Sequence, residues 1–304
     1  MPEGSDLNLP AKGGSAGLAA VAPEGPDSPL LVAVHGWLLS GRLWEPLERQ
    51  LQGRLEVWRP DLPGFGAAER PRGLQPSLAS YGRWLADAVK RRAGSRPVLL
   101  VGHSLGGSVV LHAAPGLAGQ LRGVVLVAAG GGVYQPRAFT RVRQGGAAFL
   151  ALRPSWIASL PALAPWDAPL RAEGRAARGL LACSTNRGAV AGLPRLVARL
   201  AVPSLWIAGS RDSVMEPRYV RHLAGYCPRH RFSLLEGAGH LPMQAMPAQL
   251  AALIEDWAQE EGVLASAGGQ GSAAGQPSLP GLLEQAAAAP GSGSSSRRQE
   301  DRTF

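Results

Sequence analysis

A serine at position 104 lies in a pattern that can expose a reactive hydroxyl. Residues 102–106 read Gly-His-Ser-Leu-Gly, which matches Gly-x-Ser-x-Gly. An apolar run precedes the pattern and a helical pattern follows it, and a strand, turn and helix in this order place a serine hydroxyl on a tight turn above a sheet. A second match at residues 13–17 has no apolar run before it. The spacing therefore predicts Ser104 as a nucleophile toward a carbonyl group.

A serine hydroxyl needs a base, and His240 is the best placed of the six histidines. Residues 236–242 read Glu-Gly-Ala-Gly-His-Leu-Pro and follow the last apolar run of the chain directly. The other five histidines lie in turn motifs, helical patterns or their margins: His35, His103, His112, His222 and His230. An imidazole on a loop at a strand end can take and return the proton of the serine.

The imidazole in turn needs an orienting carboxylate, for which Asp212 is the candidate. Asp212 follows the apolar run at 204–208 and lies between Ser104 and His240, the chain order in which the three groups follow a turn of this kind. The run at 124–128 leads only into glycines, and Asp61 precedes the serine within a Pro-Gly turn. The alternative role for Asp212 is a helix N-cap.

Attack on a carbonyl also needs donors for the oxygen that becomes negative. Two backbone N–H groups usually serve. We expect them from Leu105, which follows the nucleophile, and from Trp37 in the His-Gly-Trp sequence at 35–37. The alternative for residues 35–37 is an ordinary tight turn.

Short apolar runs alternate with helical patterns along the chain and must position these residues. The runs lie at 30–34, 55–58, 97–101, 124–128, 204–208 and 232–235. The helical patterns lie at 43–52, 77–92, 104–117, 217–226 and 247–259. This alternation predicts an α/β fold, with a doubly wound and mostly parallel sheet. The predicted domain spans 29–260, between a flexible segment at 1–28 and a disordered tail at 261–304 that is rich in Gly, Ala, Ser, Gln and Pro.

The alternation is interrupted once, and we interpret residues 133–200 as a small helical cap over the carboxyl edge of the sheet. Ten arginines lie there against Asp167 and Glu173, a net charge of +8. A field of one sign attracts an acidic partner, a phosphate-rich ligand or an anionic surface. The alternative is that these arginines lie on a solvated face of the protein and bind no partner. Because no nucleic-acid motif is present, nucleic acid is not expected as a partner.

The composition is typical of a globular protein, and the lack of a predicted targeting or membrane segment favours a cytoplasmic one. The 304 residues are 45% hydrophobic and 17% charged, which suffices for a core without disulfides. Arginine and proline interrupt the longest apolar stretch, and the N-terminus has no basic start before an apolar run, so neither a transmembrane span nor a secretory signal is predicted. With no phosphate loop or His-Glu-x-x-His sequence, we expect no metal and no organic cofactor.

Five motifs together resemble the α/β-hydrolase superfamily over residues 30–259. They are His-Gly-Trp at 35–37, Asp-Leu-Pro-Gly-Phe-Gly at 61–66, and the segments at 102–107, 209–212 and 237–240. The motifs follow one another in the order of that superfamily. The resemblance implies a hydrolase of this fold, and with the residues above it predicts a serine hydrolase that cleaves carboxylic esters through an acyl-enzyme.

Within that superfamily, residues 31–44 and 61–66 look like the pimeloyl-[acyl-carrier-protein] methyl ester esterases of biotin synthesis. Cap arginines hold the acidic carrier protein in that family, so the resemblance implies a carrier-bound ester as substrate. Four arginines near the start of the cap are the corresponding candidates: Arg137, Arg141, Arg143 and Arg153. The chain departs from that family at His103, where tryptophan is common.

Other functions share these motifs. The menaquinone-pathway synthase carries out an elimination with a similar triad, but an arginine commonly follows Ser-Leu-Gly-Gly there and this chain has Ser108. Cofactor-free haloperoxidases and lipases also fit, and a non-catalytic ligand receptor on the same fold is an alternative of a different class. In a further alternative, the basic cap and its aromatic residues lie on anionic lipid.

Overall fold

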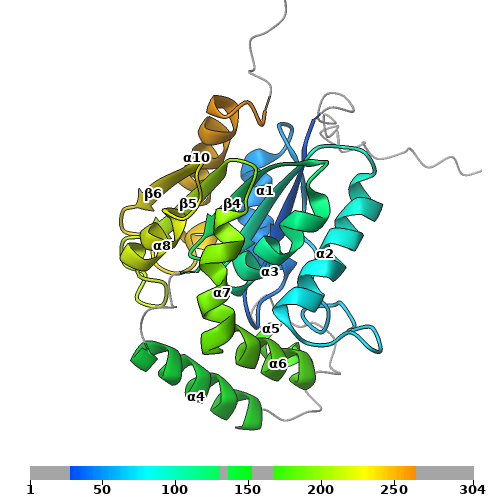
Figure 1. The fold of residues 1–304 in the computed structure, drawn as a ribbon, viewed down its shortest axis with the longest axis vertical. Coiled ribbons are helices and arrows are strands. Elements are labelled where there is room, and N and C mark those ends of the chain that lie inside the picture. Colours follow the sequence, from blue (N-terminus) through cyan, green and yellow to red (C-terminus); the bar gives the residue numbers. More distant parts are fainter. Residues whose placement is uncertain (1–27, 131–135, 153–167, 265–304) are drawn as a thin grey trace, which may run out of the picture. The chain divides into compact units, whose positions relative to one another are not determined.

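The computed structural model describes residues 28–130, 136–152 and 168–264. Strands in this part form one parallel sheet with the order β2-β1-β3-β4-β5-β6 (Figure 1). The strands are β1 (Leu30–Val34), β2 (Glu56–Trp58), β3 (Val98–His103), β4 (Leu121–Val127), β5 (Ser204–Gly209) and β6 (His230–Leu235). Every residue of β1, β3 and β5 is buried, as expected for strands covered on both faces. The prediction of a doubly wound α/β sheet is confirmed.

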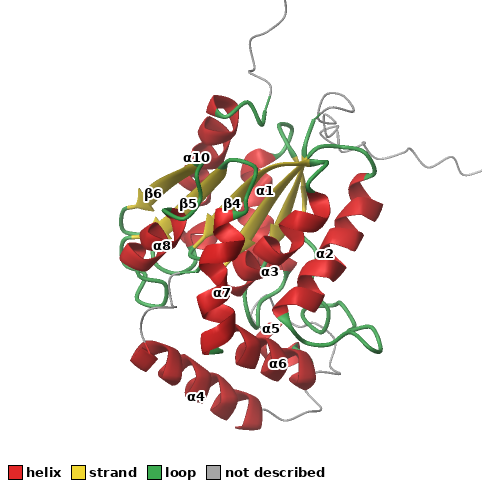
Figure 2. Ribbon diagram, in the orientation of Figure 1, coloured by secondary structure: helices red, strands yellow, loops and turns green. Residues whose placement is uncertain are grey.

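Helices cover both faces of the sheet (Figure 2). Alternate residues of β1 lie in two separate cores because successive side chains of a strand point to opposite faces. Leu30 and Val32 pack in a core that includes side chains of α2 (Leu78–Ala93), α3 (Leu105–Ala113) and α8 (Pro217–Ala224). Leu31 and Ala33 pack in a second core that includes side chains of α1 (Glu45–Leu51) and α10 (Pro247–Glu260).

Several element bounds differ from the sequence-based expectation for local reasons. β4 begins at Leu121 rather than 124. Leu121 pairs with Val98 and Gly123 pairs with Leu99, because the exposed Arg122 between them is left out of the pairing as a bulge. β6 begins at His230, since an edge strand tolerates polar side chains that an apolar pattern excludes. The helix expected at 104–117 is α3 followed by a 3₁₀ helix at Ala114–Leu117, and a 3₁₀ helix at Gly41–Trp44 precedes α1.

In the described part of the segment interpreted as a cap, four helices lie between β4 and β5. They are α4 (Pro136–Leu152), α5 (Ala168–Arg171), α6 (Gly174–Ser184) and α7 (Arg187–Ala198). α4 and α6 lie side by side (Figure 1). The start of α6 is tied to the loop after β2, because Glu173 accepts two hydrogen bonds from Arg70 at 2.6 and 2.9 Å and its N–H donates to Gly64 at 2.6 Å.

The described ranges contain no helix long and apolar enough to cross a membrane. The predictions of a flexible start at 1–28 and a disordered tail at 261–304 fall almost wholly on residues outside those ranges, and they stay predictions.

Candidate active site

Ser104 lies at the junction of β3 and α3 in a backbone conformation that side chains rarely adopt. Its φ of 53° and ψ of −120° are sparsely populated for residues other than glycine, and such strain is found at functional turns that the surrounding structure holds in place. The Ser104 N–H donates to the carbonyl of Val127 at 3.0 Å, and the Ser104 carbonyl accepts from Gly107 at 3.1 Å. The turn predicted from Gly-x-Ser-x-Gly is therefore present.

Gly106 shows why this turn needs glycine. A Cβ at this position would lie 2.4 Å from the carbonyl oxygen of His35 and 2.6 Å from that of Val34. Both atoms belong to the backbone at the end of β1, so neither can move aside easily. The first turn of α3 can approach β1 only because residue 106 has no side chain.

Asp212 and His240 come from two loops, after β5 and after β6, and are joined by a hydrogen bond. His240 Nδ1–H donates to Asp212 Oδ2 at 2.9 Å. The other carboxylate oxygen, Oδ1, accepts from the N–H groups of Val214 and Met215, each at 2.8 Å. The Asp212 side chain is fully buried, whereas 24% of the His240 side chain is exposed. This bonding fixes the tautomer of His240, with Nε2 left as the basic nitrogen.

The surroundings of Asp212 keep its carboxylate charged. Burial alone raises the pKa of a carboxyl group, but the hydrogen bond and charge of His240, with the N–H groups of Met215 and Val214, outweigh burial and hold the pKa of Asp212 below its ordinary value. An ionised carboxylate stabilises an imidazolium that forms beside it.

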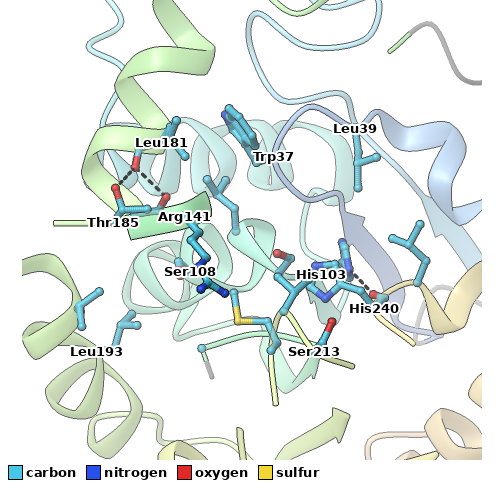
Figure 3. Close-up of a pocket in the computed structure, with 18 residues that line it drawn as sticks. Trp37, Leu39, His103, Ser108, Arg141, Leu181, Thr185, Leu193, Ser213 and His240 are labelled. Atoms are coloured by element: carbon cyan, nitrogen blue, oxygen red, sulfur yellow. Dashed lines mark hydrogen bonds between the residues drawn. The ribbon is translucent and has the colours of Figure 1, made fainter. Parts of the chain in front are cut away.

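His103 is a second imidazole in direct contact with His240. Its Nε2–H donates to the backbone carbonyl of His240 at 2.9 Å, and the two ring centroids are 4.8 Å apart (Figure 3). Burial, followed by the proximity of His240, lowers the pKa of His103 to about 3, so this ring stays neutral at ordinary pH. Sequence reasoning missed this contact, because nothing beyond the residue type linked position 103 to a carbonyl so far along the chain.

The N–H groups expected to bind an oxyanion belong to residues that line the same cavity as Ser104. Trp37 and Leu105 both line it, and neither backbone N–H donates a hydrogen bond to another residue in the described part of the chain. Leu105 is the first residue of α3, and the first N–H groups of a helix have no acceptor within it. Two unused backbone donors beside a serine suit a carbonyl oxygen that gains charge.

Two other motif residues serve the scaffold. Asp61 accepts hydrogen bonds from the N–H groups of Gly41 at 2.6 Å and Ala67 at 2.7 Å. His35 is buried, accepts from the N–H of Leu62 at 2.9 Å and donates to the carbonyl of Gly36 at 2.8 Å. These bonds join the loops after β1 and β2, which explains why both motifs occur although neither side chain lines the cavity.

Ser104 and His240 line one cavity of about 700 Å³ between the sheet edge and the cap. The wall opposite His240 includes Leu181 of α6 and Leu193 of α7 (Figure 3). Within the described ranges no hydrogen bond links the Ser104 hydroxyl to another side chain; serine and base often come together fully only with substrate bound. The same ranges contain no group of three or more His, Cys, Asp or Glu side chains arranged to hold a metal ion.

The four cap arginines predicted to bind a partner do not share one environment. Arg141 lines the cavity. Arg143 is exposed and is not among the described residues that line it. Arg153 and the side chain of Arg137 lie outside what the structure describes.

Comparisons with known proteins find relatives of this chain by sequence and by structure. A model of the alpha/beta hydrolase family matches residues 31–253. The pimeloyl-[acyl-carrier protein] methyl ester esterase of Xanthomonas axonopodis pv. citri (strain 306) is 30% identical over an alignment of 239 residues, and the match covers 70% of this chain and 88% of that protein.

Two solved structures have the same fold at lower identity. A thermophilic esterase from Thermogutta terrifontis matches with a TM-score of 0.63 and 23% identity over 77% of this chain and 90% of that one. MenH from S. aureus matches with a TM-score of 0.63 and 18% identity over 79% of this chain and 97% of that one.

Proposed function

The chain belongs to the alpha/beta hydrolase family and is a carboxylic ester hydrolase, and from this premise we propose that it works through an acyl-enzyme on Ser104. His240 is the general base and acid, Asp212 orients it, and the N–H groups of Trp37 and Leu105 bind the oxyanion. The observation that carries this assignment is the hydrogen bond between Asp212 and His240, at the rim of the cavity that also contains the strained Ser104.

The first half of the reaction transfers the acyl group to the enzyme. Ser104 Oγ attacks the carbonyl carbon while its proton passes to His240 Nε2, and the carbonyl oxygen becomes an oxyanion held by the two N–H groups. The imidazolium is stabilised by Asp212. When the tetrahedral intermediate collapses, the bond to the alcohol oxygen breaks and His240 gives that oxygen its proton, so the alcohol leaves.

The second half repeats these steps with water. His240 takes a proton from a water molecule whose oxygen attacks the acyl-enzyme carbonyl, and the same N–H groups hold the second oxyanion. Collapse breaks the bond to Ser104 Oγ, which recovers its proton from His240. The products are a carboxylic acid and the regenerated serine.

Labelling with a fluorophosphonate tests the nucleophile. Wild type should be labelled at Ser104 and should hydrolyse nitrophenyl acetate, whereas Ser104→Ala should do neither while it keeps the unfolding free energy of wild type. Ser108→Ala is the matched control because Ser108 lines the same cavity, and it should still be labelled. A folded wild type that takes no label would contradict the assignment and support a non-catalytic receptor.

The substrate that best fits the relatives is a methyl ester carried by acyl-carrier protein. The curated relative from Xanthomonas is a pimeloyl-[acyl-carrier protein] methyl ester esterase, and residues 133–200 of this chain have a net charge of +8. An acidic carrier protein would be attracted to such a segment. The exposed Arg143 of α4 is then part of the docking surface.

Reversing one exposed charge tests the carrier. Arg143→Glu should lower kcat/KM for the carrier-bound methyl ester about tenfold at low salt and leave nitrophenyl acetate hydrolysis unchanged. Arg175→Glu on α6, which is also exposed and away from the cavity, shows whether the effect is specific to α4. Equal losses on both substrates would exclude docking of the carrier at Arg143.

A further inference from the structure

The cavity beside Ser104 has one permanently charged side chain among the described residues that line it. That side chain is Arg141 of α4. No carboxylate lines the cavity in the described ranges, and most of the other lining side chains are apolar or carry a hydroxyl. Apolar pockets with a few placed polar groups use those groups to select and orient a ligand.

Arg141 enters the cavity from the side opposite His240 (Figure 3). Figure 3 shows it on the side of the cavity formed by Leu181 and Thr185, with His103 and His240 on the other side. Thr185 does not neutralise the guanidinium, because its hydroxyl is uncharged. That hydroxyl donates its proton to the carbonyl of Leu181 at 2.7 Å. A group bound at Arg141 would therefore be a distal part of the substrate and not the ester undergoing cleavage.

Arg141 also differs from many of the arginines outside the cap. Among the described residues no acidic side chain pairs with it, and Glu173, the acidic residue that directly precedes α6, is bound to Arg70 instead. Many arginines outside the cap do have a glutamate partner. They are Arg54, Arg59, Arg70, Arg92, Arg96, Arg218, Arg229 and Arg231.

The helix that carries Arg141, α4, packs against side chains that line the cavity. Gly146 of α4 packs so closely that a Cβ there would lie 2.5 Å from Trp37 Cη2 and 2.9 Å from Leu181 Cδ2. Trp37 is itself held by a hydrogen bond from its Nε1–H to the carbonyl of Ala177 at 2.9 Å. The guanidinium is thus presented from a helix fixed against two side chains that line the cavity.

We propose that this cavity selects esters that carry a second, free carboxylate, with Arg141 as the residue that determines this specificity. The substrate class is the monoester of a dicarboxylic acid. A guanidinium binds a carboxylate through two parallel hydrogen bonds, while a neutral distal group leaves it hydrated and a cationic one is repelled. This inference rests on the proposed esterase chemistry at Ser104 and concerns free monoesters, since an acyl chain attached to a carrier protein has its far end joined to the carrier and not free as a carboxylate.

Matched esters test the proposal on the full-length enzyme. The substrates are monomethyl suberate, which ends in a carboxylate, and methyl octanoate, which has the same chain length without it. Wild type should show a kcat/KM about tenfold higher for monomethyl suberate, and the preference should shrink as salt is added. Arg141→Gln should remove the preference by slowing only monomethyl suberate, and Arg141→Lys should keep part of it.

Arg175→Gln is the control variant, since it removes an equal charge from the exposed surface of α6 outside the cavity, and it should leave both rates unchanged. Inhibition of nitrophenyl acetate hydrolysis by the two esters gives the same comparison as binding constants, so slow turnover does not prevent the test. Equal values for the two esters in wild type, or equal losses on both in Arg141→Gln, would overturn the proposal.

Two further outcomes are distinguishable. A phosphonate analogue of monomethyl suberate that binds more than about tenfold better than the carboxylate would overturn the choice of carboxylate in favour of a phosphate group. If wild type hydrolyses monomethyl suberate and methyl octanoate with equal kcat/KM, the inference about Arg141 fails and the esterase assignment stands. If fluorophosphonate does not label Ser104, the proposed function itself fails.

Discussion

The carboxyl edge of the sheet, where the strands end and where Ser104, Asp212 and His240 lie, is held far more tightly than the cap that faces it. At this edge, the backbone of α3 at Gly106 packs directly against the backbone at the end of β1. The buried Asp212 carboxylate accepts three hydrogen bonds. In the cap, α4 meets the sheet side through the ring of Trp37, and Arg141 and Arg143 are exposed. The difference separates two tasks: the edge fixes the reacting atoms, and the cap presents groups that choose the substrate.

Because of this difference, equal chemical changes should have unequal effects in the two regions. A change at the edge displaces or disables atoms that take part in bond breaking, so kcat should fall. A change in the cap alters contacts with distant parts of the substrate, so KM and the order of preference among esters should change.

The largest effect is expected for Asp212→Asn. The amide cannot accept the Nδ1–H of His240 as an anion does, and it favours the wrong imidazole tautomer, so kcat should fall about a thousandfold to ten-thousandfold while KM changes little. Hydrolysis of nitrophenyl acetate measures kcat, and urea unfolding checks that the fold persists. A loss smaller than about tenfold would remove Asp212 from the mechanism.

Gly106→Ala should follow in size. Its new methyl group would meet the backbone carbonyls of Val34 and His35, so α3 or β1 must shift and Ser104 must move with it. We expect the free energy of unfolding to fall by about 3 kcal/mol and kcat to fall about a hundredfold. Retention of wild-type kcat and stability would show that this junction is less rigid than the edge described above.

His103→Phe should lower kcat by about tenfold to a hundredfold, because the carbonyl of His240 loses its buried donor and the base is held less firmly. His103→Gln retains an N–H donor and should recover part of the loss. The two variants separate positioning from packing: equal losses in Phe and Gln would contradict a role for the hydrogen bond.

The same residue should also make the fold sensitive to acid. Folding lowers the pKa of His103 from 6.5 to about 3, so its contribution is complete above about pH 6.5 and is lost as the pH falls toward 3. The free energy of unfolding should therefore decrease by up to about 1.4 kcal/mol per pH unit for this group in that range. His103→Phe removes the imidazole and should reduce the slope of the unfolding free energy against pH by the contribution of one proton. An unchanged slope would show that the acid sensitivity comes from other groups, such as the buried His35.

Gly146→Ala should give the smallest effect. Its methyl group would meet only the side chains of Trp37 and Leu181, which can yield, and alanine favours a helix over glycine. We expect stability within about 1 kcal/mol of wild type, unchanged kcat and a change of about threefold in KM for long esters. A loss of kcat as large as that of Gly106→Ala would erase the distinction between cap and edge.

The strands and the reacting residues at their carboxyl ends could be predicted from local patterns. Apolar runs located the six described strands, because buried parallel strands require unbroken apolar residues. Ser104, Asp212 and His240 could be chosen because strand ends and glycine-rich turns leave local signals. Polar β6 residues and the irregularity at Arg122 moved strand bounds, since pairing with a neighbour and not the local pattern decides where a strand begins.

The sequence by itself determined the α/β class, the turn at Ser104 and the residue types able to cleave an ester, because each depends on neighbours within a few positions. Only the tertiary structure decided that Asp212 accepts the Nδ1–H of His240, that His103 supports the carbonyl of His240, and that Arg141 lines the cavity while Arg143 does not. These contacts join segments far apart in the chain, and their distances depend on how strands and helices pack, which no local pattern encodes.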